Sequence, residues 1–221
     1  METGSEPRRV AAQALASRHL ERGPRRPDGD RSRFAYAERP RPEHAGWGLR
    51  SALVRLAQPE PQWAARVLTV VRRVDATVGP LRRPLDRHTV LLDDATDPVV
   101  DARVVDLGRL ATTLDPTWSV RAVPAVVDPI VVDDVVTGYA AGLAAGDGEP
   151  LEPEEITALP VVVVCLALDH LADTVAAWAV TAPGPAPLDL IEVVCDGAWA
   201  ALDACGAPTE ADRPRRRPTS A

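Results

Sequence analysis

The side chains best suited to chemistry lie in one stretch, Pro80–Gly108, which reads PLRRPLDRHTVLLDDATDPVVDARVVDLG. Its carboxylates and short β-branched runs have the outline of a phosphoryl-transfer site, in which bound Mg²⁺ neutralises phosphate charge. The first candidate ligand is Asp106, which follows two valines and precedes Leu-Gly. A second is Asp86, in a loop that also offers Arg83 or His88 as a phosphate contact. The competing interpretation makes Asp106 a turn or cap residue and the loop around Asp86 a solvated run of alternating charges.

Lysine is absent, because all 25 basic residues are Arg. This excludes a phosphate-loop lysine, a Schiff-base lysine and the strand lysine that kinases place on nucleotide phosphates. Residues 51–208 carry 10 Arg against 23 acidic residues, whereas residues 1–50 carry 11 Arg against 7. Binding DNA or RNA requires a basic face on the folded part. We therefore expect no specific nucleic-acid partner and treat the Arg-rich ends as solvated tails.

The three cysteines, Cys165, Cys195 and Cys205, lack C-x-x-C spacing, and each falls on an apolar helical face. Free Cys packs as a small hydrophobe, so we expect reduced core residues. The four His residues are scattered, and none forms a ligand pair at helical spacing. The longest apolar run, Ile156–Leu168, is too short for a bilayer, and the N-terminus has no leader pattern. A cytoplasmic protein without a membrane partner is expected.

Composition divides the chain into three parts. Residues 1–48 are rich in Arg and Pro and predict a disordered N-terminal segment, with a short helix at 9–20 as its ordered exception. Residues 49–207 have the apolar periodicity of one helical domain, and residues 208–221 predict a disordered basic tail. Within 49–58, the spacing of Leu49, Leu53 and Leu56 indicates a short amphipathic helix.

The elements of the central domain follow from hydrophobic spacing. Helices are predicted over 61–78, ended by Gly79-Pro80, and over 131–143, 153–178 and 187–205. Val161–Val164 suggests a strand by propensity, but the helical spacing around it runs for five turns and outweighs propensity. Pro160 is expected to kink or restart this helix. Strands are predicted at 89–92 and 102–106, separated by a turn-forming DDATDP.

Tryptophans divide into two groups. Trp63, Trp178 and Trp199 lie on apolar helical stripes, where an aromatic residue is far more often core than a ligand stacker. Trp118 lies in the irregular segment after the strands and is the one we consider for a pocket.

The order of a helix, a strand pair ending in VVDLG, an irregular TTLDPTW and a string of helices resembles the aminoglycoside phosphotransferase and choline kinase family. The resemblance covers its C-terminal lobe, from about Pro61 to Leu202, and includes GYAAG and the segment LEPEEITALPVVVVCLALDHLADTVAAWA. It implies an α+β, mostly α-helical fold: a kinase-like C-terminal lobe with a short strand pair and a helical subdomain. It also implies that Asp106 is the metal-binding Asp and Gly108 the turn glycine after it.

The catalytic loop departs from the family pattern. Aligning TVLLDD with the family's NVLLDD puts Thr89 where the metal-binding Asn belongs and Pro84 where the catalytic Asp belongs. Arg82 and Arg83 replace His-Gly, and Ser119 stands where the family usually keeps an Asp. A positioned base is worth about 10²–10⁴ in rate, so these replacements predict lost catalysis.

The nucleotide-binding N-terminal lobe of the family is missing, because only about 60 mostly Arg/Pro-rich residues precede the first strong helix. We therefore expect a degenerate, non-catalytic binding or interaction module without a cofactor. A protein partner, or residues 49–58, would cover the face left open by the missing lobe. The alternative is a small-molecule kinase using Mg and ATP, with a partner lobe or a re-registered Asp86. An unrelated helical domain with a chance VDLG would lack paired strands before its helices.

Overall fold

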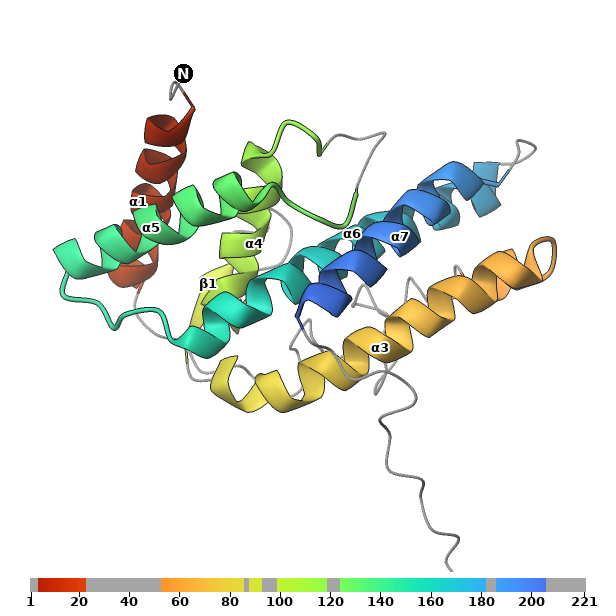
Figure 1. Cartoon of the computed structure of the whole chain (residues 1–221), viewed down its shortest axis with the longest axis horizontal. Helices are drawn as coiled ribbons and strands as arrows, with labels where there is room; N and C mark the ends of the chain where they lie inside the picture. Colours follow the sequence, from red (N-terminus) through yellow and green to blue (C-terminus); the bar gives the residue numbers. More distant parts are fainter. Residues whose placement is uncertain are drawn as a thin grey trace, which may run out of the picture.

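The computed structural model describes residues 4–22, 53–85, 88–92, 99–118, 124–181 and 186–205 (Figure 1). Its long helices are α1 (Ser5–Arg22), α3 (Pro61–Leu85), α4 (Arg103–Leu114), α5 (Pro129–Ala145), α6 (Pro153–Thr181) and α7 (Leu188–Ala204). A shorter helical segment covers 53–57. The prediction of a mostly α-helical fold is confirmed. Sheet in the described residues is limited to one pair of strands, β1 (Thr89–Leu92) and β2 (Val99–Ala102).

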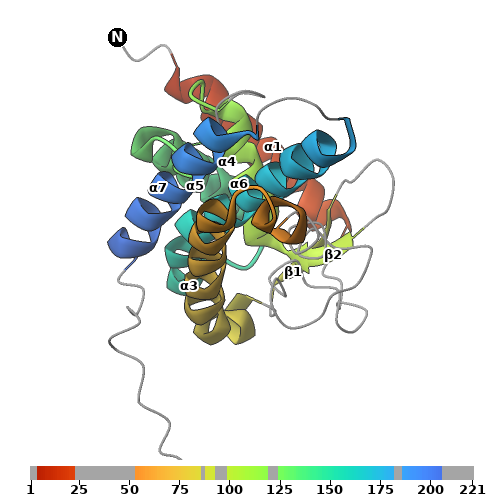
Figure 2. The same cartoon turned by 90° about the vertical axis from the view of Figure 1, so that its right-hand side faces the viewer.

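Helix α6 is the centre of the packing and contacts α3, α4 and α7. Helix α1 lies along α5, and α4 contacts both α5 and α6 (Figure 1). The two strands lie side by side at one edge of the helices (Figure 2). They pair antiparallel with Thr89 opposite Ala102, so the first strand lies where it was predicted and has a neighbouring partner strand.

The valine run of α6 is helical, as its spacing predicts. Val161, Val164 and Leu168 are at most 1% exposed, and burying each such side chain stabilises the fold by about 1.5–3 kcal/mol. Helix α6 does not restart at Pro160 but continues through this residue to Thr181. By length and composition, Pro153–Trp178 could cross a bilayer, and 67% of that window is buried inside the fold.

The second predicted strand is placed wrongly. The prediction was 102–106, whereas β2 ends at Ala102 and α4 begins at Arg103. The reason is burial: Val104, Val105, Leu107 and Ala111 are all at most 3% exposed and face the core at helical spacing. Tertiary burial of one helix face therefore overrides the β propensity of two adjacent valines.

Helix α3 also differs from its prediction, because it does not stop before Gly79-Pro80 but continues to Leu85. Leu85 is 1% exposed, so its burial holds the last turn against the core. This packing outweighs the low helix propensity of Gly and Pro. Helices α5 and α7 begin and end within two residues of their predictions.

The segment 1–48 is not disordered throughout, since α1 forms a packed helix over Ser5–Arg22 and extends the predicted helix at both ends. Ala12, Leu15 and Ala16 are buried in the core. Glycines of α5 permit this contact: a Cβ on Gly138 would meet the Arg9 carbonyl oxygen at 2.4 Å. The composition of 1–48 is dominated by its later part, which obscures the apolar stripe of α1. Residues 23–48 and 206–221 lie outside the described residues.

Charged groups fasten α1 to α5. Arg9 Nε donates to Asp134 Oδ1 at 3.0 Å and Arg8 Nη1 donates to Oδ2 at 3.4 Å, while Asp134 is 2% exposed. Burial alone would raise the pKa of Asp134, but hydrogen bonds from Ser5, Arg9 and Arg8 lower this pKa below its ordinary value of 3.8.

Acid should therefore weaken the domain through α1. Because the folded-state pKa of Asp134 is lowered, its stabilisation is present above pH 3.8 and is lost as pH falls below 3.8 through the lowered folded-state pKa. We expect the urea midpoint to drop between pH 6 and pH 3, and Asp134→Asn to lower the midpoint at pH 6 and flatten this dependence. The matched exposed variant Asp173→Asn should retain the wild-type profile, and an equal flattening in both would contradict the assignment.

Candidate functional site

Asp106 lies in the first turn of α4 rather than at the end of a strand. Its Oδ2 is 3.2 Å from His19 Nε2 of α1, and its Oδ1 is 3.7 Å from Arg109 Nη1. Both carboxylate oxygens thus face nitrogen groups. Among the described residues, no group of three His, Cys, Asp or Glu side chains is arranged to hold a metal ion.

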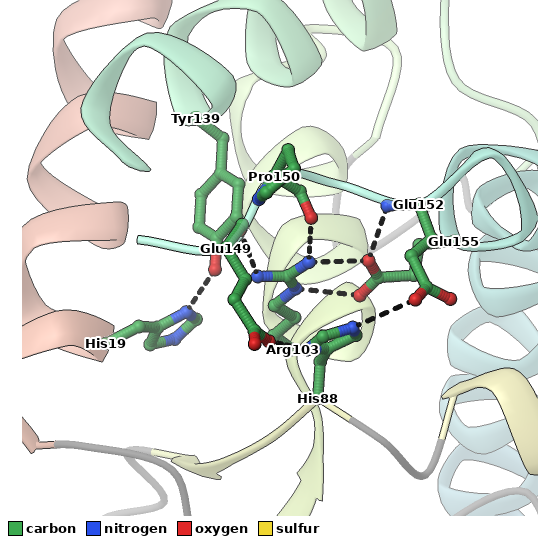
Figure 3. Close-up of polar contacts among 8 residues, drawn as sticks. All are labelled: His19, His88, Arg103, Tyr139, Glu149, Pro150, Glu152 and Glu155. Atoms are coloured by element: carbon green, nitrogen blue, oxygen red, sulfur yellow. Dashed lines mark hydrogen bonds and ion pairs between the residues drawn. The ribbon is translucent and has the colours of Figure 1, made fainter. Parts of the chain in front are cut away.

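His19 connects Asp106 to a buried tyrosine. Its Nδ1 is 2.7 Å from the Tyr139 hydroxyl, and the two rings meet edge to face (Figure 3). Tyr139 is 0% exposed, and burial raises its pKa well above 10, so the phenol keeps its proton. A hydroxyl donating to Nδ1, with Nε2–H donating to Asp106, satisfies all three groups. The arrangement joins α1, α4 and α5.

Arg103 and Glu155 form a buried ion pair beside this chain of contacts (Figure 3). Arg103 Nε and Nη2 donate to the two Glu155 oxygens at 2.8 and 2.6 Å. Its other bonds go to the carbonyl oxygens of Glu149 and Pro150. Burial lowers the pKa of Arg103, but the hydrogen bond and charge of Glu155 outweigh it and the pKa is raised. Arg103 therefore joins the start of α4 to the start of α6.

The other predicted residues of the phosphotransfer stretch are not brought together with Asp106. His88 Nδ1 is 3.1 Å from Glu149 and its Nε2 is 3.4 Å from Glu152. Two carboxylates would repel a phosphate here, so the predicted phosphate contact of His88 is not supported. Thr89 begins β1. Asp86 and Ser119 lie outside the described residues, as do the side chains of Arg82, Arg83 and Pro84.

A separate apolar pocket of about 470 Å³ opens between the segment 125–129 and helices α5, α6 and α7. Its walls include Val132 and Val136 of α5, Leu159 and Val163 of α6, and Ala200 and Ala204 of α7. Its volume lies in the range of about 300–1,000 Å³ that small-molecule sites occupy. No residue lines both this pocket and the cavity beside Asp106 and His19.

Asp115 fixes the irregular wall of this pocket. It is 1% exposed and accepts hydrogen bonds from the backbone N–H groups of Thr117 at 2.8 Å and Asp128 at 2.7 Å. Burial raises the pKa of Asp115, but these bonds and one from the Thr117 hydroxyl outweigh it and the pKa is lowered. The carboxylate thus attaches the pocket segment to the end of α4.

Trp118 and Gly197 hold the same segment from two sides. Trp118 Nε1 donates to the Val126 carbonyl oxygen at 2.6 Å, so this tryptophan supports the pocket wall without lining the pocket. The backbone at Pro124 touches α7 at Gly197. Ala125, which lies between Pro124 and Val126 in the chain, has a φ of 55°. This left-handed conformation is maintained by the close packing of the segment. Trp63, Trp178 and Trp199 pack against the core, as predicted.

Removing the Asp115 carboxylate should loosen the pocket wall. We expect Asp115→Ala to lower the free energy of unfolding by about 2 kcal/mol, because it removes the buried charged acceptor of three hydrogen bonds. Urea denaturation measures this loss. Asp128→Ala removes one exposed helix cap and should lower stability by about 1 kcal/mol. Equal effects of the two variants would contradict the anchoring role of Asp115.

Sequence reasoning missed His19, Tyr139, Arg103, Glu155 and Asp115. Two sequence patterns could have indicated two of these residues. Glu155 is the third residue of a helix that begins at Pro153, a position typical of a capping glutamate, and Tyr139 lies in a predicted helix that also contains two glycines. All three cysteines are free; Cys165 and Cys195 are buried as predicted, whereas Cys205 is half-buried and follows the end of α7. Comparison with protein-family models, curated proteins and solved structures found no match.

Proposed function

We propose that this protein is a non-catalytic helical binding module, a degenerate relative of the aminoglycoside phosphotransferase and choline kinase family. The contacts of Asp106 support loss of catalysis, since a carboxylate that meets His19 and Arg109 is occupied within the protein. Its helical position also departs from the family pattern, in which this Asp ends a strand. A cytoplasmic location remains part of the proposal.

The observation that carries a binding function is the apolar pocket between α5, α6 and α7. It has the volume and the apolar lining of small-molecule sites, and Ile156 at 44% exposure and Val126 at 39% mark an opening to solvent. Apolar surface of this kind lowers its free energy by taking up an apolar ligand. We assign the pocket as the binding site.

Residues 49–58 are the part of the chain proposed to cover the face left open by the missing lobe. In the helical segment 53–57, Leu56 is 1% exposed and Leu53 packs against the core. This placement supports the proposed covering role of residues 49–58. It also shifts the proposed binding function from that face to the pocket.

The test compares two ligands in thermal melts of the full chain. We expect n-octanol to raise the melting temperature, since a ligand at about one hundred times its Kd stabilises by about 2.7 kcal/mol. Ala200→Trp, which fills the pocket from an exposed lining position, should abolish the shift. Val193→Trp, at an exposed position on α7 outside the pocket, should keep it. A shift that survives Ala200→Trp would contradict the proposal.

Millimolar Mg²⁺-ATP tests the enzyme alternative in the same experiment. The proposal predicts no shift. A shift with Mg²⁺-ATP that disappears in Asp106→Ala would replace the binding module with a small-molecule kinase.

A further inference from the structure

The polar chemistry of the pocket favours hydrogen-bond donors. Asp133 is the one charged or hydrogen-bonding side chain among the described residues that line the pocket, and the others are Ala, Val, Ile, Leu and Pro. An ionised carboxylate accepts hydrogen bonds and donates none. Asp133 is exposed on the second turn of α5 and has no ion-pair partner within the described part of the chain. A polar group of a ligand that contacts Asp133 is therefore favoured as a donor, and a positive charge strengthens the contact.

A backbone acceptor belongs to the same wall. Pro160 lies inside α6 and has no N–H to donate to the carbonyl oxygen four residues earlier. That carbonyl is the Ile156 carbonyl, and both residues line the pocket. Ile156 is half exposed, so this part of the wall is accessible to an incoming ligand. The residues that line the pocket thus supply one carboxylate and one α6 carbonyl without its usual helical donor.

We infer that the pocket binds an amphiphilic cation, a small apolar molecule with one primary ammonium group. The apolar chain contacts the Val and Ala walls, and the ammonium group donates to the Asp133 carboxylate and the Ile156 carbonyl. The acidic composition of residues 51–208 attracts cations at longer range. This inference rests on the proposed function, because it names the ligand class of the same pocket.

Calorimetric titration of the full chain at low salt tests the ligand class with three matched probes, n-octylammonium, n-octanol and n-octanoate. We expect octylammonium to bind about fivefold more tightly than octanol, as an exposed ion pair allows, and octanoate to bind most weakly. Asp133→Asn should remove the advantage of the cation and leave octanol unchanged. Asp173→Asn, the same substitution at an exposed position of α6 outside the pocket, should keep the advantage.

The other possible results of the titrations would each overturn the cation preference, and they differ in whether the proposed function also fails. Equal affinities for the three probes, all abolished by Ala200→Trp, would overturn the cation preference and leave the proposed function standing. A preference that survives Asp133→Asn would also overturn it, because the charge would then act from elsewhere. Binding of no probe would overturn both. A dimer that Ala200→Trp dissociates would show that a second copy occupies the pocket.

Discussion

Replacing Arg103 with Ala should lower the free energy of unfolding by about 3–5 kcal/mol, because it leaves a buried carboxylate without its partner. Glu155 is 1% exposed, and two of the three hydrogen bonds that its carboxylate accepts come from Arg103. The same guanidinium satisfies the carbonyl oxygens of Glu149 and Pro150. Urea denaturation of wild type and variant at pH 7 measures the difference.

Two further variants separate the lost pair from lost packing. Arg109→Ala removes a half-exposed arginine from the same helix and should change stability by less than about 1 kcal/mol. Arg103→Met combined with Glu155→Met replaces the pair by apolar groups and should recover part of the loss, since replacing both partners is milder than removing one. If Arg103→Ala were as mild as Arg109→Ala, the ion pair would not join α4 to α6 as described.

Gly197→Ala should lower the free energy of unfolding by about 3 kcal/mol, at the upper end of overpacking effects. A Cβ at this position would lie 1.6 Å from the Pro124 carbonyl oxygen, which belongs to the backbone and cannot rotate away. To avoid this clash, the backbone at Pro124 would have to move away from α7. The movement would displace the segment 124–128, which forms a wall of the pocket, so octanol binding should weaken together with stability. Urea denaturation and calorimetry measure the two effects.

Gly146→Ala is the matched control for this substitution. Its Cβ would meet the end of the Leu20 side chain, which can move, so the expected loss is below about 1 kcal/mol. A loss in Gly197→Ala no larger than this would contradict the close contact between α7 and the pocket segment.

The helices could be predicted where one periodic pattern extends over several turns. Residues 153–178 keep helical spacing through four valines and a proline, and the structure confirms that helix. The error at 102–106 arose because two valines fit a strand or a buried helix equally well over so short a window. Burial against α6 decides between them: a Cβ on Gly108 would meet Val162 Cγ1 at 2.6 Å, and no local pattern contains that contact.

The polar contacts were less predictable, since they join residues far apart in the chain. Asp106 could be singled out from VVDLG, but its partner His19 lies 87 positions away, in a short predicted helix that no local pattern connects with α4. Asp115 similarly reaches Asp128 across an irregular segment. The pocket forms between the segment 125–129 and the helices α5, α6 and α7. The sequence of each of these alone predicts only an apolar helix face or a loop.

Methyl NMR during titration with n-octanol tests the central claim, that this protein binds an apolar ligand between α5, α6 and α7. We expect chemical-shift changes concentrated on the pocket residues, and their loss in Ala200→Trp; these residues are Val132, Val136, Ile156, Leu159 and Val163. Shifts spread evenly over the core, or shifts that persist in Ala200→Trp, would contradict it.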